Sequence, residues 1–297
     1  MTVSHSRYAW CVLLSLALAG GVVQAASDPD AYLDVTVEGD SRVPGLLSTE
    51  GSRFDTDYTV EPSNTSGSPA TRKTNRLRLN FGCRHGGGYL TGCLVSLFVD
   101  SRAGTGGHVH SSDRPTGSFT RLFGTVDPHT GLLETVFTAP EASGIITIYG
   151  EAFHPLTFVR SEEFTIGVGF EGLVELPDSD QYLKIGSRPE HPDNHFGTST
   201  LVTRMQELAV AYREAYPDAT PLEYNDMSLE FGGVFDLNKN WAPPHRGHRT
   251  GVHVDLRTRT IPDSALRELR LLAPKFGLKV FDETKTPNPH FHLTSSE

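Results

Sequence analysis

Apolar and polar residues alternate at every second position in several short segments of the N-terminal half of the chain. Residues 33–37, 77–81 and 164–170 show this period of two, while residues 93–99 and 144–149 are apolar almost throughout. The first pattern is typical of a strand with one buried face, and the second of a strand buried on both faces. Clusters of Gly, Ser, Pro and Asn separate the segments, so we predict an all-β antiparallel sandwich of immunoglobulin-like type.

The apolar period becomes helical in the C-terminal third of the chain. Residues 201–212 carry apolar side chains at helical spacing, and Thr198 or Ser199 is expected as the N-cap. A second helix is expected over residues 263–276, because its apolar residues share one face and Gly277 follows as a stop.

These patterns predict two domains, which suits a chain of 297 residues. The sandwich would occupy residues 26–178, a linker leading into the second domain residues 179–199, and a mixed α+β domain residues 200–297. In that second domain, residues 251–256 and 290–293 are expected to form short strands.

The first 25 residues are typical of a secretory signal peptide. Arg7 precedes an apolar stretch, residues 10–23, that ends in the small-residue pattern Val23-Gln24-Ala25. A transmembrane helix needs roughly 20 apolar residues, so we expect cleavage after Ala25 rather than an uncleaved anchor. The mature chain would then be periplasmic or extracellular, with no stable membrane span.

Charge and cysteine content narrow the range of functions. The formal net charge of −10 argues against an electrostatic hold on nucleic acid or on anionic lipid. Signal cleavage would remove Cys11 and leave Cys83 and Cys93 in an oxidising compartment. We expect these two cysteines to form a disulfide that pins a hairpin, the alternative being two separately buried thiols.

Four metal-ligating side chains crowd the stretch APPHRGHRTGVHVDLR near the C-terminus. His248 and Asp255 would lie roughly 23 Å apart on a straight strand, too far for one ion. If both bind the same metal, the chain must reverse between them, and Gly251 is placed for such a turn because glycine adopts positive φ freely. His290 and His292 are two residues apart, so on a strand they would share a face, one binding metal and the other free for proton transfer.

The string His248-x-x-Gly251-x-x-x-Asp255, followed by His290-x-His292, resembles the metallopeptidase superfamily of lysostaphin-type endopeptidases, D-alanyl-D-alanine carboxypeptidases and hedgehog domains. Within that superfamily, GHRTGVHVDL is most similar to penicillin-insensitive murein endopeptidase. The resemblance covers only the second half of the chain.

The resemblance implies an α+β fold around a central antiparallel sheet, with a zinc ion held by His248, Asp255 and His292. It also implies that His290 is the unligated, catalytic histidine beside the water on the metal. The chain departs from the carboxypeptidase and hedgehog pattern at Pro289, where a glutamate base is expected three residues before the last ligand.

Several further residues near the motif are candidates for substrate contacts. Arg246, Arg249 and Arg257 could receive a peptide carboxylate, or they could be solvent-facing charges. His253 is in phase with Asp255, so it could face the site and contact the substrate, or it could have a packing role or orient a ligand.

Other polar residues lie outside the motif. In the sandwich, His108, His110 and Asp113 could bind a surface metal or be solvated loop residues. The remaining candidates are His191 and His195 as cleft or loop residues and Asp226 and Asp236 as partners of ligand histidines.

The sequence therefore predicts an exported zinc-dependent peptidase that acts on peptidoglycan or on another peptide substrate. The alternative is a non-catalytic, zinc-stabilised module for binding or adhesion at the cell surface.

Overall fold

The computed structural model of the chain describes residues 30–38, 54, 56–63, 75–110, 114–155, 157–242 and 247–296. The expected signal peptide lies outside the described residues. In the described part of the chain, no helix is long and apolar enough to cross a membrane.

Two packed sheets form the N-terminal part. The first contains β1 (Ala31–Glu38), β3 (Arg76–His85), β8 (Leu132–Thr138) and β6 (Ser118–Phe119), with β4 (Gly88–Tyr89) paired to β3. The second contains β2 (Tyr58–Val60), β11 (Phe164–Val168), β9 (Gly144–His154), β5 (Leu94–Ser101) and β7 (Phe123–Thr125), with β10 (Thr157–Arg160) paired to β9. The strand pairs are antiparallel apart from β2, which runs parallel to β11.

The alternation of apolar residues explains how these two sheets pack. In β3, the side chains of Leu77, Leu79 and Phe81 are at most 1% exposed, whereas Arg76 and Arg78 on the other face are exposed. Residues of β5, β8, β9 and β11 join them in one buried cluster. The mostly β character predicted from the sequence is confirmed.

The predicted disulfide between Cys83 and Cys93 is present, with the two Cα atoms 6.4 Å apart. Its position differs from the expected hairpin staple. Cys83 lies in β3 of the first sheet, while Cys93 directly precedes β5 of the second sheet. The bridge therefore links the two sheets through their core, where both cysteines are fully buried. The short strand β4 intervenes between them and forms the hairpin with β3 by itself.

A separate sheet forms the centre of the C-terminal part. Its strand order is β13 (Tyr182–Lys184), β15 (Leu222–Tyr224), β16 (His253–Arg257), β18 (His290–Ser295) and β17 (Leu278–Asp282). The pairs from β15 to β17 are antiparallel, and β13 runs parallel to β15 at the edge. A small sheet of β12 (Leu173–Glu175) and β14 (Phe196–Thr198) precedes the first helix.

Helix α2 (Ser199–Ala215) begins where the sequence indicates, because the Thr198 hydroxyl accepts a hydrogen bond from the Leu201 N–H. Helix α3 (Asp263–Leu272) is shorter than expected. It changes into the 3₁₀ turn η2 (Ala273–Phe276), in which Pro274 has no N–H to continue an α-helix, and Gly277 ends the turn at φ 73°.

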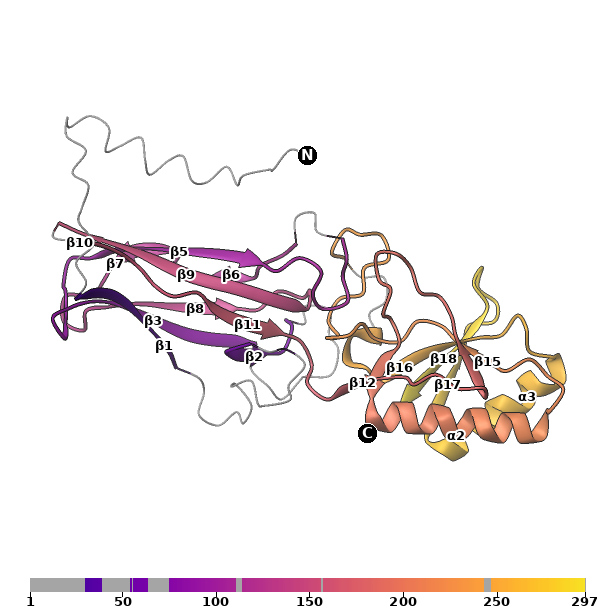
Figure 1. Cartoon of the computed structure of the whole chain (residues 1–297). Helices are drawn as coiled ribbons and strands as arrows, with labels where there is room; N and C mark the ends of the chain where they lie inside the picture. Colours follow the sequence, from indigo (N-terminus) through magenta and orange to yellow (C-terminus); the bar gives the residue numbers. More distant parts are fainter. Residues whose placement is uncertain are drawn as a thin grey trace.

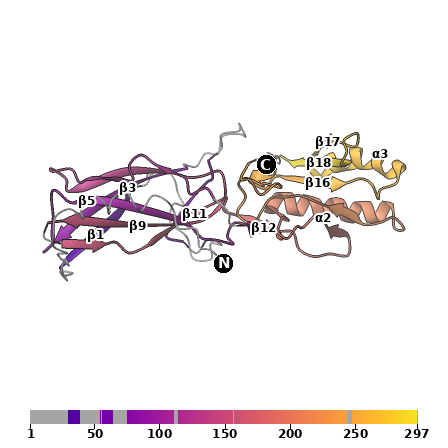
Figure 2. The same cartoon turned by 90° about the horizontal axis from the view of Figure 1, so that it is seen from above.

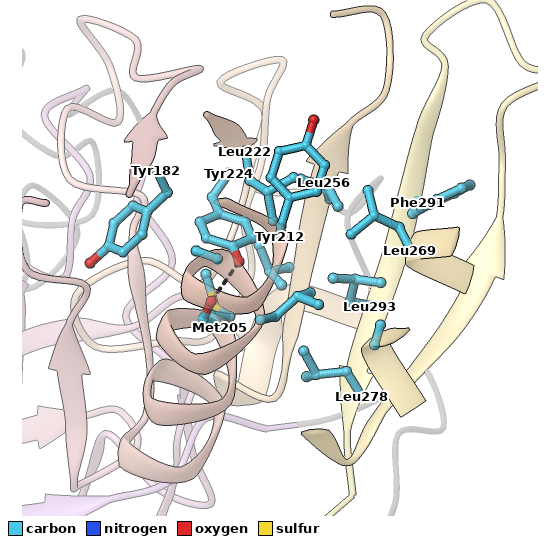
Figure 3. Packing of buried hydrophobic residues seen from close by; sticks show 14 of the residues in the cluster. Tyr182, Met205, Tyr212, Leu222, Tyr224, Leu256, Leu269, Leu278, Phe291 and Leu293 are labelled. Carbon is cyan, nitrogen blue, oxygen red and sulfur yellow. Dashed lines mark hydrogen bonds between the residues drawn. The ribbon is translucent and has the colours of Figure 1, made fainter. Parts of the chain in front are cut away.

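Both helices pack into one buried cluster with the C-terminal sheet. Figure 3 shows Leu256, Phe291 and Leu293 of the sheet in this cluster, and the hydrogen bond from the Tyr224 hydroxyl to the Met205 carbonyl. One face of β16 and β18 is thereby closed by the core.

The sandwich and the helix-containing part lie end to end, and the chain passes between them from β11 to β12 (Figures 1 and 2). We call the region where the two parts meet the junction. Backbone hydrogen bonds cross it, among them the one from the Val234 N–H to the Glu141 carbonyl at 3.0 Å. Loops from both parts therefore meet at the junction.

Candidate metal centre

Pairing of β16 with β18 brings the expected ligands of the C-terminal motif together. Asp255 lies directly opposite His292 in the register of the two antiparallel strands. Residues of alternate parity, such as Val254 and Leu293, point to the opposite face and are fully buried in the core. The other face of the same two strands, which we call the polar face, therefore holds the side chains of Asp255 and His292.

His248 reaches this face from the 3₁₀ turn η1 (Gly247–Thr250). The chain reverses directly after the turn at Gly251, whose φ is 74°, as the sequence predicts. The turn is also tightly packed, since a Cβ atom at this position would lie 2.3 Å from Cδ2 of Leu173. The Gly251 carbonyl accepts a hydrogen bond from the Thr198 N–H at 2.8 Å, which ties the turn to the start of α2.

The three side chains present a donor set that could hold a metal ion. One ligand atom from each of His248, Asp255 and His292 lies within 4.8 Å of the others. Oδ1 of Asp255 is 2.8 Å from Nδ1 of His292 and 3.5 Å from Nε2 of His248. Two donors on one tetrahedral zinc ion lie about 3.3 Å apart, so the donor types and spacings fit a divalent transition metal.

Charge and hydrogen bonding favour the ionised form of the central carboxylate. Burial alone would raise the pKa of Asp255, but hydrogen bonds with His248 and His292 outweigh burial and hold the pKa well below its ordinary value. The carboxylate is therefore negative at neutral pH, which is the form that binds a metal.

His253 contacts His292 on the polar face of the sheet. Its Nδ1 lies 2.9 Å from Nε2 of His292 and 3.0 Å from the hydroxyl of Thr294. Since Nδ1 of His292 faces Asp255, the contact with His253 fixes the plane of the His292 ring. Burial, together with the neighbouring His292 and His248, lowers the pKa of His253 to about 4. Of the roles open in the sequence, the contacts favour the orienting one over substrate binding.

His290 lies at the edge of the same group. Its Nδ1 is 2.7 Å from the Asn288 carbonyl, so Nδ1 donates a proton there and Nε2 faces the ligands. Nε2 is 3.5 Å from Oδ1 of Asp255 and 3.5 Å from Oε2 of Glu283. No local pattern in the sequence indicates Glu283, because the pairing of β17 with β18 brings it to the site.

Arg249 does not contribute to this face. It is 2% exposed, and its guanidinium donates to Oε2 of Glu141 at 3.0 Å and to the Ser63 carbonyl at 2.7 Å. Both partners belong to the sandwich, so the expected substrate contact is corrected to a contact across the junction. Arg246, the other arginine expected at the substrate, lies outside the described residues.

Arg257 is the third arginine expected at the substrate, and it lies beside the motif. It lies opposite His290 in the register of β16 and β18, and its side chain is 41% exposed. Its Nη1 is 3.4 Å from Oε2 of Glu223. A carboxylate approaching the polar face could therefore still reach the guanidinium.

The Asp226 carboxylate contacts asparagine side chains, and its backbone carbonyl accepts a hydrogen bond from the Asp255 N–H at 2.9 Å. Its Oδ1 accepts a hydrogen bond from Nδ2 of Asn194 at 2.9 Å, and its Oδ2 lies 3.2 Å from Nδ2 of Asn225. His195, also considered a cleft residue, is 4% exposed, with Nε2 3.2 Å from the Tyr224 carbonyl. Both residues support the loops around the sheet.

Replacing Gly251 with Ala is expected to weaken metal binding at this site and to destabilise the fold. The left-handed conformation alone costs about 1–2 kcal/mol for a residue with a Cβ, and the clash with Leu173 adds a shift of η1 that displaces His248. Zinc titration and denaturant unfolding measure the two effects.

Gly172→Ala is the matched control, because Gly172 has φ 78° and nothing within 4 Å of an added Cβ. This variant should show the backbone cost with unchanged zinc affinity. Equal zinc affinities in the two variants would contradict the role assigned to the turn.

Comparisons with known proteins add little to this geometry. No family model matches the chain, and no curated protein matches it. Among solved structures, the D0-D1 domain of intimin is similar over 38% of this chain and 45% of that chain, with 11% sequence identity and a TM-score of 0.24. The chain thus spans less than half of that chain's length. The molecule is a disulfide-linked, mostly β protein with His and Asp groups that could bind a metal ion.

Proposed function

We propose that the chain is an exported, zinc-dependent peptidase made of two domains, whose substrates are the peptides of peptidoglycan. An immunoglobulin-like sandwich would occupy residues 26–178, a linker residues 179–199 and the peptidase domain residues 200–297. The observation that carries the proposal is the convergence of the His248, Asp255 and His292 donors, with Nε2 of His290 beside them.

The donor set favours a catalytic use of the metal. Three protein ligands leave one position of a tetrahedral ion open, which is the arrangement of catalytic zinc sites. Zinc in such a site lowers the pKa of a bound water toward about 7 and polarises a carbonyl group. The disulfide supports export, since such bridges persist mainly in oxidising compartments.

The side chains around the ligands have separate roles in the proposed reaction. Nε2 of His290 accepts the proton of the attacking water and returns it to the leaving amine, because Nδ1 is already engaged by the Asn288 carbonyl. The Glu283 carboxylate, 3.5 Å from Nε2, stabilises the imidazolium that forms once Nε2 has taken the proton. Arg257 binds a carboxylate of the stem peptide through its exposed guanidinium. The sandwich holds the enzyme to the wall or to a partner.

The direct test is digestion of purified peptidoglycan by the purified chain. New amino and carboxyl termini are expected among the released muropeptides, their formation should stop after treatment with a chelator, and added zinc should restore it. If a chain that binds zinc releases no peptide termini at any pH, the peptidase proposal is wrong.

Replacing His290 with Ala is expected to lower kcat by about 100-fold to 10,000-fold, the usual contribution of a positioned proton carrier. The zinc content should stay nearly unchanged, because His290 is outside the ligand set. Elemental analysis beside the muropeptide assay measures both quantities. Loss of zinc in this variant would mean that His290 is itself a ligand.

A non-catalytic, zinc-stabilised binding module remains the second candidate, and one observation favours it. Pro289 stands three residues before His292, so that position offers no carboxylate, and Glu283 is 48% exposed on its side chain. A module of this kind would bind zinc and peptidoglycan without releasing peptides, so the same digestion separates the two functions.

A further inference from the structure

A second group of metal-ligating side chains lies at the junction between the sandwich and the C-terminal part. We call it the junction cluster, and its members are His108, His110, His191 and Asp236. The first two belong to the loop after β5, and the other two to loops of the C-terminal part. Asp113, considered with the histidine pair in the sequence, lies outside the described residues.

The four ligand atoms of the junction cluster are nearly equidistant. Oδ1 of Asp236 lies 3.2, 3.3 and 3.1 Å from the nearest nitrogens of His108, His110 and His191. The three nitrogen pairs are 3.4, 3.2 and 3.3 Å apart. Four equidistant points form a tetrahedron, and zinc bonds of 2.0–2.1 Å give a tetrahedron with edges of about 3.3–3.4 Å. All six separations thus match a tetrahedral ion at the centre.

Hydrogen bonds among the side chains do not account for this arrangement. Each imidazole nitrogen carries one proton or one lone pair in the plane of its ring, so three such nitrogens and one oxygen cannot all satisfy one another at a single point. The three rings are instead close to perpendicular, with interplanar angles of 85°, 77° and 78°. Such an arrangement of rings is suited to three ligands that approach one ion from different directions.

The cluster is buried rather than solvated. The side chains of His108, His191 and Asp236 are at most 1% exposed, and that of His110 is 8% exposed. A buried carboxylate is costly unless a positive charge compensates it. Arg114 lies within electrostatic reach of Asp236, but its guanidinium donates to the backbone carbonyls of Arg102, Thr105 and Ser143.

The surroundings hold Asp236 in a position to offer one oxygen to the cluster. Its Oδ2 accepts a hydrogen bond from the backbone N–H of Trp241 at 2.7 Å, which leaves Oδ1 for the three histidines. Trp241 has the unusual φ of 55°, and its ring lies 4.4 Å from the His110 ring and 4.8 Å from the His108 ring. The indole therefore covers the cluster.

The loop after β5 is itself built to reach the junction. Gly106 and Gly107 have φ of 71° and 83°, and a Cβ on them would lie 2.6 Å from the Ser143 carbonyl oxygen and 3.0 Å from Cβ of Leu229. The Val109 N–H donates to the Glu190 carbonyl at 3.0 Å. The loop thus contacts both parts of the molecule before it presents its histidines.

We propose that the junction cluster binds a structural zinc ion, which fastens the sandwich to the C-terminal part. Four protein ligands fill the tetrahedral positions, so the ion has no open position for a substrate, in contrast to the three-ligand site. The proposal does not depend on the peptidase activity, because it concerns a different set of ligands.

The test compares zinc content in variants of the full chain. The unaltered chain is expected to bind about two zinc ions, and Asp255→Asn to retain about one, held by the junction cluster. Adding His110→Gln to Asp255→Asn should remove the remaining ion or weaken its binding at least about 100-fold, since even partners outside the ligand shell change affinity by 10–100-fold. His110 is the most exposed of the four ligands, so its replacement should disturb folding least.

His195→Gln is the matched control, because His195 is another buried histidine that faces a backbone carbonyl instead of the cluster. In the Asp255→Asn background it should leave the zinc content unchanged. A second measurement leaves the four ligands of the junction cluster unaltered. Zinc added to the metal-free Asp255→Asn chain should protect the backbone amides of residues 102–110 and of residues 188–195 from hydrogen exchange together. If the Asp255→Asn chain binds no zinc, or if zinc protects neither segment, the structural site does not exist.

Discussion

The Asp255→Asn chain is expected to lose hydrolysis of peptidoglycan peptides and to lose zinc from the three-ligand site. Asp255 is 2% exposed, and its Oδ1 lies within 3.5 Å of ring nitrogens of His248, His290 and His292. An amide has nearly the same shape but no charge, so the variant keeps the packing and removes the anionic ligand. Activity should fall by more than about 100-fold, the upper range for changes just outside a ligand shell.

The measurements are zinc content and the rate of release of peptide termini. Asp226→Asn is the matched control, because Asp226 is also a buried aspartate on a neighbouring loop, its carboxylate contacts the amide nitrogens of Asn194 and Asn225, and the substitution keeps the backbone carbonyl that accepts from the Asp255 N–H. It should retain both zinc and activity. An Asp255→Asn chain with normal activity would exclude this site as the catalytic centre, whatever the state of the junction cluster.

Replacing Arg249 with Met is expected to lower the free energy of unfolding by about 2–3 kcal/mol while leaving KM unchanged. Loss of one partner of a buried ion pair costs about 3–5 kcal/mol, and the 22% exposure of the Glu141 side chain lets water compensate part of that cost. The guanidinium contacts the sandwich and not the polar face of β16, so peptide binding should not depend on it.

Arg257→Met is the comparison variant, for which we expect the larger effect on KM and the smaller effect on the free energy of unfolding. The side chain of Arg257 is 41% exposed and that of its partner Glu223 is 10% exposed, and the contact between them is long at 3.4 Å. A pair with one solvated partner contributes about 0–1 kcal/mol, so the loss of Arg257 should cost less stability than Arg249→Met and raise KM for an anionic peptide by about 10-fold, the value of one hydrogen bond to a charged group. Denaturant unfolding and steady-state kinetics on both variants decide the assignment. If Arg249→Met raises KM at unchanged stability, the original expectation of substrate binding is restored.

Local patterns were sufficient for most of the elements. The period of two at residues 77–81 and 164–168 falls within β3 and β11, and the Thr198 cap and the Gly277 stop lie where the sequence indicates. These features depend on neighbours a few residues apart, so they can be read from the chain itself. The split of the second helix follows the same local rule, because its last leucine is Leu272 and Pro274 comes shortly after the helical spacing ends.

The candidate metal centre was predictable in part. Gly251 marks the reversal, and the same-face spacing of His290 and His292 reflects the period of a strand. The contact of Asp255 with His292 required the register of two strands that are 37 residues apart in sequence. Glu283 was missed because its approach depends on the pairing of a third strand.

The sequence by itself determined the kinds of elements, the cysteine pair and the supply of metal-ligating side chains, because these depend on composition and on short-range periodicity. Only the tertiary structure decided which side chains meet. In the tertiary structure, the disulfide links the two sheets of the sandwich, and Arg249 lies at the junction. The tertiary structure also joins His110 to Asp236, 126 residues further along. Contacts between such distant residues depend on how whole sheets pack and pair, a property of the complete set of buried surfaces that no local stretch of sequence contains.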